Sequence, residues 1–324
     1  MIHANSFNIE NNKKRFDEKI LSSLKYISES LKTPFRIDAE IHFNWQVYAN
    51  YFLCLDAIKE NNEDNARKYH CFALNALTFD RAQKNDNIHH PEITFITSNN
   101  INSSLSLTLK DIYDKPDNDV NDDGVYAFGP FTGDTGCELL RIQQAIEILH
   151  STSPYYYSFV ISLIKHIVLV GQTARGGIKS GSTLKTLGCI IISPNTKEEF
   201  CPTGQYIEDL IHEASHNYLF LEQAIDPLVN NPVVNLYEAP FRKDKRPMSG
   251  IYHANYVLGN IVSYFSQAVK ATSNDKKTCN TQFLNRALNR YKETSSIIEL
   301  HGDLTVRGRD IFDEMKTQVT KCIN

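Results

Sequence analysis

The sequence predicts an α+β fold that is predominantly helical, with a helix that carries an HExxH pattern packed beside a small β-sheet. Three observations predict it. Long segments toward both ends of the 324-residue chain carry apolar residues at helical spacing. Short apolar or alternating segments in the middle are typical of strands. After these strands comes "DLIHEASHNYLF", residues 209–220, whose broad apolar band predicts a largely buried helix.

The N-terminal third reads mainly as helices. Apolar residues recur at helical spacing over residues 14–32, and residues 44–61 and 63–77 predict two further helices. Two neighbouring helices with a short connection usually form a helical hairpin. Residues 91–98 and 103–113 then alternate enough between apolar and polar side chains to predict two strands.

The rest of the chain mixes helices with short strands and ends in helices. Turn-forming residues predict a loop over residues 114–124. The further predicted elements are a helix at 137–151, a helix passing into a strand at 154–171, a buried strand at 186–195, and helices at 204–225, 248–270, 279–300 and 307–323.

The composition narrows the function classes. A net charge of -4 and an isoelectric point near 6.3 give no electrostatic reason to expect nucleic acid or an anionic membrane as a partner. No window approaches the roughly 18 apolar residues of a membrane helix. The N-terminus has no apolar segment of signal-peptide type. The seven cysteines form no C-x-x-C pair, which favours free thiols and a cytoplasmic location.

Two histidines in "IHEASH" form the first candidate site. His212 and His216 are four residues apart, so a helix places them on one face, where two neutral imidazoles can hold one metal ion. Glu213 lies beside His212 and points partly toward the same ion. Two buried histidines and a glutamate without a metal would carry a substantial polar cost. The segment therefore predicts a metal-binding helix.

A third protein ligand is needed, and two residues compete for that position. Glu238 lies 22 residues after His216, within the range that gluzincin-type proteases use for a distant glutamate. His253 lies 37 residues after His216, on a second predicted helix that can face the first. The metzincin pattern, with a third His soon after the motif, is absent because residue 222 is Glu.

Two arginines precede the helix of His253. Arg242 and Arg246 share a constrained loop with Pro240 and Pro247. Arginine matches a carboxylate through two parallel hydrogen bonds, so a rigid loop of this kind beside a metal suits a small dicarboxylate. The alternative is that the two arginines pair with acidic residues at the surface.

These segments together resemble the HExxH-motif peptide-modification proteins, the α-ketoglutarate-dependent HExxH-type peptide β-hydroxylase family. The resemblance rests on a Ser-rich segment before a strand, an HEA-x-H helix, an Arg-x-Asp-x-Arg-Pro loop, a Gly-x-x-His-Ala helix and an L-T-x-x-G segment at residues 304–308. One departure is Phe241 before Arg242, where Trp is more usual. The resemblance covers roughly residues 125–315 and is densest from 205 to 260.

The resemblance implies a non-haem Fe(II)/2-oxoglutarate-dependent dioxygenase that uses O2 to hydroxylate a ribosomally made precursor peptide. Glu213, the general base of a zinc protease, would then lie in the outer shell or replace His253 as a ligand. The implied iron ligands are His212, His216 and His253, and the implied co-substrate-binding residues are Arg242, Arg246 and Ser182.

We accordingly divide the chain into a mainly helical N-terminal region, residues 1–124, and an HExxH-type metal-dependent catalytic region, residues 125–324, which can form one continuous domain. Two rival functions stay open. One is a cytosolic zinc metallopeptidase of gluzincin type, with Glu213 as general base and Glu238 as third ligand. The other is a metal-stabilised protein that binds peptides without turnover and docks them on its helical N-terminal third.

Overall fold

The computed structural model describes residues 2–35, 41–78, 90–113, 128–173, 177–194, 201–239 and 244–323. By its internal contacts the chain divides into two compact units that interleave along the sequence. The sheet unit comprises residues 10–135 and 164–196, and the histidine unit comprises residues 1–9, 136–163 and 197–324. The predicted division at residue 124 separates a helical region from a metal-dependent catalytic region. It concerns function rather than compactness, and it stays a prediction.

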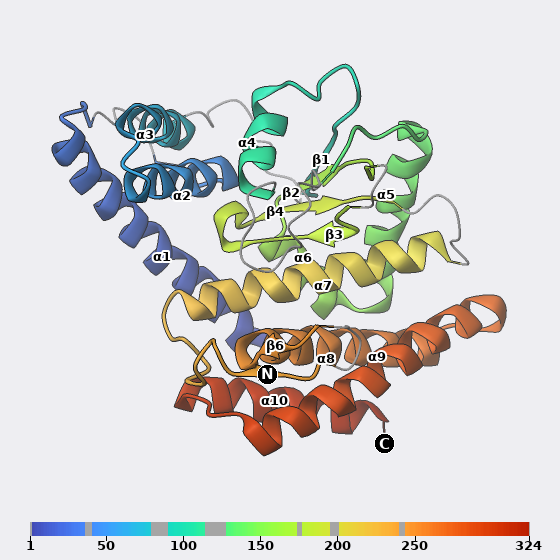
Figure 1. Cartoon of the computed structure of the whole chain (residues 1–324). Coiled ribbons are helices and arrows are strands. Elements are labelled where there is room, and N and C mark those ends of the chain that lie inside the picture. Colours follow the sequence, from blue (N-terminus) through green and yellow to red (C-terminus); the bar gives the residue numbers. More distant parts are fainter. Residues whose placement is uncertain are drawn as a thin grey trace. The chain divides into compact units, whose positions relative to one another are not determined.

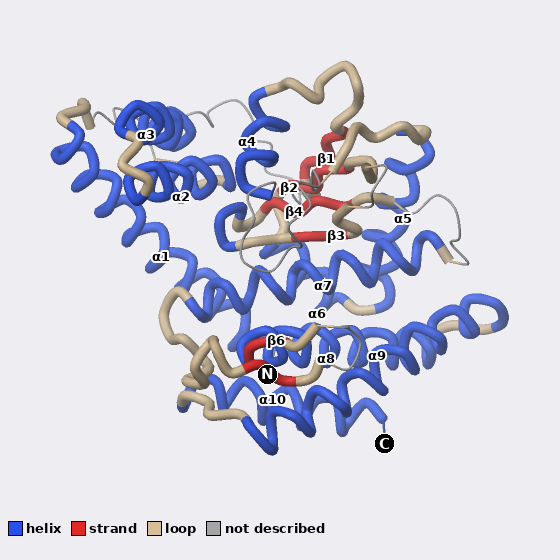
Figure 2. The backbone as a smooth tube through the Cα atoms, in the orientation of Figure 1, coloured by secondary structure: helices blue, strands red, loops and turns tan. Residues whose placement is uncertain are grey.

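A four-stranded mixed sheet forms the centre of the sheet unit, in the order β1-β2-β4-β3. β1 (Glu92–Phe95), β2 (His166–Leu169) and β4 (Cys189–Ile192) run parallel, and β3 (Ser180–Gly181) pairs antiparallel with β4. Figure 2 shows the strands of this sheet in red. β2 and β4 are buried along their whole length, as the runs "HIVL" and "CIII" predict for central strands.

The helices of the sheet unit come mostly from its N-terminal part. α2 and α3 form the predicted helical hairpin (Figure 1). Leu53 of α2, Leu109 of α4 and Ile191 of β4 belong to one core cluster and are almost completely buried. The elements are α1 (Ile2–Leu31, from residue 10 onward), α2 (Trp45–Lys59), α3 (Glu63–Thr78), α4 (Ser104–Tyr113) and the short 3-10 helix η1 (Leu184–Thr186).

The strand predicted over residues 103–113 is wrong, because this segment is the helix α4. Its buried residues are Ser106, Leu109 and Ile112, which recur every three residues and so lie along one helical face. Ser103 also caps the helix, since its hydroxyl accepts a hydrogen bond from the main-chain N–H of Ser106. The alternation of Leu and Ser or Thr resembled a strand, but burial follows the helical period.

The histidine unit is helical apart from a two-stranded antiparallel ribbon. α8 packs against α7, α9 and α10 (Figure 1). It is the central helix of the unit, because every residue from Asn255 to Ser266 is also buried. The elements are α5 (Thr135–Thr152), α6 (Pro154–Leu163), α7 (Pro202–Gln223), α8 (Met248–Ala271), α9 (Asn274–His301), α10 (Val306–Ile323) and the ribbon strands β5 (Leu236–Tyr237) and β6 (Arg246–Pro247).

Helices predominate and the sheets are small, so the predicted α+β class is confirmed. The packing of the HExxH helix beside the four-stranded sheet stays a prediction, because the helix and this sheet belong to different units. None of the helices in the described ranges is long and apolar enough to span a lipid bilayer. The predicted loop at 114–124 lies outside the described residues.

Candidate metal centre

The HExxH segment lies within α7, as the sequence predicts. Pro202 begins the helix, where its missing N–H leaves no intrahelical bond unmade. The apolar band of the helix is buried and holds it against its neighbours, so the motif has a fixed backbone. The fully buried apolar residues in and around the motif are Leu210, Ile211, Ala214 and Leu219.

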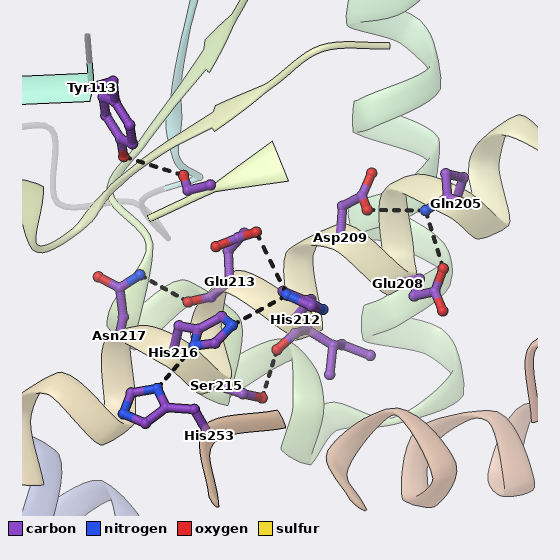
Figure 3. Close-up of polar contacts among 12 residues, drawn as sticks. Tyr113, Gln205, Glu208, Asp209, His212, Glu213, Ser215, His216, Asn217 and His253 are labelled. Atoms are coloured by element: carbon purple, nitrogen blue, oxygen red, sulfur yellow. Dashed lines mark hydrogen bonds and ion pairs between the residues drawn. The ribbon is translucent and has the colours of Figure 1, made fainter. Parts of the chain in front are cut away.

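His212 and His216 turn their Nε2 atoms toward each other, 3.2 Å apart (Figure 3). Their ring centroids are 4.9 Å apart and their ring planes are inclined by 60°. Two imidazole nitrogens bound to one ion at about 2.1 Å, with about 100° between the bonds, would also lie about 3.2 Å apart, with ring centroids about 5 Å apart. The pair therefore has the convergent geometry that one divalent ion requires.

His253 reaches this pair from α8. Its Nδ1 lies 3.1 Å from the Nδ1 of His216, whereas His212 faces the other nitrogen of that ring (Figure 3). The two rings are inclined by only 23° and their centroids are 5.3 Å apart. That separation is close to the nitrogen-to-nitrogen distance plus two ring radii of about 1.1 Å each, so the two nitrogens oppose each other nearly in line, as in an N–H···N hydrogen bond.

Among the described residues, no three His, Cys, Asp or Glu side chains surround one common point. The cause is the ring of His216, which faces His212 with Nε2 and His253 with Nδ1. The imidazole donors of His212 and His216 fit a divalent metal such as Fe(II) or Zn(II). A third protein donor would have to come from a side chain beside this pair.

The protonation state of His253 also suits a metal centre. Desolvation lowers the pKa of His253 to about 4, so the ring is neutral near pH 7. A neutral imidazole has one bare nitrogen, which can accept a hydrogen bond or bind a metal.

Glu213 is only 1% exposed, although it carries a carboxylate. Its Oε1 lies 4.0 Å from the Nε2 of His212, and its main-chain carbonyl accepts a hydrogen bond from the side-chain amide of Asn217 (Figure 3). Two donors bound at about 2.1 Å to one ion can be at most about 4.2 Å apart. Glu213 is therefore at the limit of sharing an ion with His212.

Glu238, the rival for the third ligand position, lies at the protein surface. Its side chain is 80% exposed, and its Oε1 forms an ion pair with the Nζ of Lys245 at 3.0 Å. An exposed carboxylate in such a pair is well hydrated and gains little from it. Nothing in this arrangement associates Glu238 with the histidines.

Two of the three predicted co-substrate residues, Arg246 and Ser182, are described by the structure, and they lie in different units. Arg242 lies outside the described residues. Arg246 forms part of β6, directly before α8; its side chain is 18% exposed, and its Nε lies 3.2 Å from the Oδ2 of Asp244. Ser182 lies between β3 and η1 in the sheet unit, not in the histidine unit.

A buried polar chain supports the motif from behind. The hydroxyl of Ser215 donates to the carbonyl of Ile211 and accepts from the side-chain amide of Asn260 on α8. The Oδ1 of Asn260 accepts from the hydroxyl of Tyr156 on α6, and this hydroxyl accepts from Gln318 on α10. Four helices are thereby joined at the motif, through polar groups that would be costly to bury without partners.

The end of α7 is fixed by the segment that the sequence shows as L-T-x-x-G. Arg307 donates two hydrogen bonds to the carboxylate of Glu222, at 2.9 and 2.7 Å, and Glu222 is 3% exposed. The hydroxyl of Thr305 donates to Asp226 and accepts from the N–H of Gly308. Gly308 is needed there, because a Cβ on it would lie 2.0 Å from the carbonyl oxygen of Leu228.

Sequence reasoning missed Gln223 and Asn260. Gln223 contacts His253 and lies seven residues after His216, two helical turns farther along the same face of α7. Asn260 is a buried amide within the apolar segment "NYVLGNIVSYF", and a polar residue in such a segment usually has a specific partner. These two signals are present in the sequence, but only the positions of the helices give them meaning.

Comparison with known proteins leaves the resemblance to rest on the motif residues alone. No family model matches the chain, and no curated protein matches it. Membership of the HExxH-type peptide β-hydroxylase family therefore stays a prediction.

Proposed function

We propose that the protein is an Fe(II)/2-oxoglutarate-dependent dioxygenase that hydroxylates a β-carbon in a ribosomally made precursor peptide. One observation carries the proposal. Two helices bring the rings of His212, His216 and His253 together, with nitrogen-to-nitrogen distances of 3.1 and 3.2 Å between neighbours. The resemblance of residues 205–260 supports the same proposal, because its motifs contain these three histidines.

Each of these residues would have a definite task. Bound Fe(II) would supply the coupling of 2-oxoglutarate decarboxylation to insertion of an oxygen atom into a C–H bond. His212 and His216 would hold the ion through Nε2, and the sequence predicts His253 as the third ligand. Three protein donors leave positions open for the co-substrate and O2. Arg246 would pair with a carboxylate of 2-oxoglutarate.

The motif has one partly exposed side chain beside a buried one. The side chain of His212 is 41% exposed, whereas Glu213 beside it is buried. Solvent therefore reaches part of the His212 side chain, while the buried face of α7 keeps the histidine backbone in place.

The zinc metallopeptidase is the second candidate, and the buried Glu213 favours it. A carboxylate beside a metal-bound water is what a hydrolase needs as its general base. This candidate also needs a third ligand, and Glu238, the residue predicted for that role, is exposed and paired with Lys245. We therefore place it behind the dioxygenase.

A direct test supplies the protein with Fe(II), ascorbate, 2-oxoglutarate and a library of short synthetic peptides. We expect succinate to form only when Fe(II) is present, and a subset of peptides to gain about 16 Da, the mass of one oxygen atom. Absence of succinate from the Fe(II)-loaded protein, with peptide cleavage by the Zn(II)-loaded protein, would replace the proposal with the metallopeptidase.

A further inference from the structure

The contact between Gln223 and His253 determines which ring nitrogens of the histidines carry protons. The Nε2 of His253 lies 2.9 Å from the Oε1 of Gln223. An amide oxygen can only accept a hydrogen bond, so the Nε2 of His253 carries the proton and donates it. In a neutral imidazole, the form that an ordinary histidine takes above about pH 6.5, the other nitrogen, Nδ1, is then bare.

The protonated nitrogen of His216 follows from that of His253. Its Nδ1 lies 3.1 Å from the bare Nδ1 of His253, nearly in line with it, so His216 donates an N–H to His253. A neutral His216 then has a bare Nε2. This is the nitrogen that faces His212 in the convergent, metal-compatible geometry.

We infer that Gln223 is a positioning residue that fixes the tautomer of His253 and, through it, leaves the Nε2 of His216 bare for a metal ion. A hydrogen-bond partner on the far nitrogen of a metal-binding histidine orients the ring and selects its tautomer. His253 would be that partner for His216, and Gln223 is the partner on the far nitrogen of His253. The assignment of protons concerns the metal-free protein, in which the bare Nδ1 of His253 accepts a hydrogen bond from His216. As a third ligand, His253 would give up this contact and bind the ion through the same bare Nδ1. Only the consequence for metal affinity rests on the proposed function.

The fold gives Gln223 the fixed position that this role requires. It is the last residue of α7, and on the same helix its neighbour Glu222 forms the buried two-bond pair with Arg307. The end of the helix is thereby held against α10. A side chain at a frayed helix end would lose its hydrogen bond to His253, whereas this one is placed by its neighbour.

The reverse assignment is equally specific. If the amide group of Gln223 donated to the Nε2 of His253 instead, every proton in the chain would move to the other nitrogen. His253 would then donate from its Nδ1, and the Nε2 of His216 would carry a proton that blocks metal binding. The two assignments are distinguishable because the nitrogen NMR shifts of protonated and bare imidazole nitrogens differ.

The first experiment is nitrogen-15 NMR of the histidine side chains in the metal-free protein near pH 7.5. We expect protonated Nε2 in His253 and protonated Nδ1 in His216. In Gln223→Leu the resonances of His253 should shift toward a mixture of tautomers. In Gln223→Glu, whose carboxylate also accepts, the wild-type pattern should return. A wild-type His253 protonated on Nδ1 would overturn the inference, whatever the enzyme does.

The second experiment titrates the same proteins with Co(II), followed by visible absorption. Gln223→Leu should weaken Co(II) binding by about 10–100-fold, the usual loss for such a partner, and Gln223→Glu should restore it. Gln205→Leu is the matched control, because Gln205 lies on the same helix and bonds Glu208 and Asp209 instead. Equal affinities in wild type and Gln223→Leu would also overturn the inference. Correct tautomers without succinate formation would refute the proposed function alone.

Discussion

His216 and His253 meet through their Nδ1 atoms at 3.1 Å, although 37 residues separate them in the sequence and different helices carry them. Because of this contact, mutation of His253 and of Glu238 can show which of the two is the third metal ligand. Fe(II) binding should weaken in His253→Ala by at least about 10–100-fold, the loss expected even for an outer-shell partner, and more if His253 binds the ion directly.

The matched variant is Glu238→Ala, which removes the gluzincin-type ligand and only an exposed ion pair with Lys245. We expect its Fe(II) affinity to stay within about twofold of wild type, because exposed pairs contribute little. Anaerobic equilibrium dialysis measures both affinities. Loss of the metal in Glu238→Ala, with His253→Ala unaffected, would move the protein to the gluzincin class.

Arg246 provides a second prediction, on the co-substrate. Replacing Arg246 with Leu removes a guanidinium that could pair with a carboxylate, and loss of a buried charged partner costs about 2–5 kcal/mol. We expect 2-oxoglutarate to bind the Fe(II)-loaded variant at least about 30-fold more weakly, while Fe(II) itself binds as before.

Arg242→Leu belongs in the same series, because the sequence predicts either arginine or both. Arg309→Leu serves as control, since Arg309 is an exposed residue of α10. Calorimetry with 2-oxoglutarate reports all three. Unchanged affinity in both Arg246→Leu and Arg242→Leu would show that the arginine loop has a structural role only.

Glu213 discriminates between an oxygenase and a hydrolase. General base catalysis contributes about 10²–10⁴ in rate, so a zinc peptidase should lose its activity in Glu213→Gln while keeping its metal. The proposed dioxygenase needs no general base from the protein, and we expect the Zn(II)-loaded wild type to cleave no peptide. Mass spectrometry of a peptide mixture decides. Zn(II)-dependent cleavage that disappears in Glu213→Gln would restore the protease interpretation.

Gly308 tests the clamp at the end of α7. A Cβ at this position would lie 2.0 Å from the main-chain oxygen of Leu228, so Gly308→Ala must displace backbone, at a cost of about 1–3 kcal/mol in the free energy of unfolding. Gly250→Ala is the matched control, since its nearest contact would be an ordinary 3.7 Å to the Cβ of Arg246. Urea denaturation should show the first variant destabilised and the second near wild type; equal stabilities would contradict this account.

His166 gives a prediction about pH in the sheet unit. The indole N–H of Trp45 donates to its Nδ1, so its Nε2 carries the proton and donates to the hydroxyl of Thr94. Burial lowers the pKa of His166, and the exposed Glu92 opposes this shift only in part. His166 therefore becomes protonated near pH 6.5 in the unfolded chain, but only at a lower pH in the folded protein.

The contribution of His166 to the free energy of unfolding should accordingly be fully present above about pH 6.5 and fall as the pH drops below it. His166→Gln keeps an acceptor and a donor but does not titrate, so the wild-type advantage over this variant should shrink between pH 7.5 and 5.5. Trp45 is the only tryptophan of the chain, and its fluorescence reports the unfolding. A difference between the two proteins that stays constant with pH would contradict the prediction.

Much of the fold follows from local patterns in the sequence. The apolar band around the motif predicts α7, and the runs "HIVL" and "CIII" predict β2 and β4, because burial on all sides leaves few other choices. The strand prediction for residues 103–113 was wrong because apolar and hydroxyl residues can alternate by chance. Its helix is decided by packing of Leu109 and Ile112 into the core, which local pattern does not reveal.

The candidate site is predictable only in part. The spacing of His212 and His216 fixes their convergence within one helix, but the approach of His253 depends on how α8 packs against α7. Gln223 is informative only after His253 is in place, since the side chain gains its role from a different helix. Pairs of residues on separate helices leave no periodic signal in a single sequence.

Ser215 occupies one of the two unspecified positions of the HExxH pattern, yet its hydrogen bond to Asn260 continues through Tyr156 to Gln318. A search by motif treats this position as neutral. A recombinant protein shortened before residue 318 would keep every candidate metal donor and still lose a partner of the hydroxyl of Tyr156. The C-terminal helix α10 thus supports the motif through this chain of hydrogen bonds. Mutant libraries that vary position 215 should therefore vary position 260 as well.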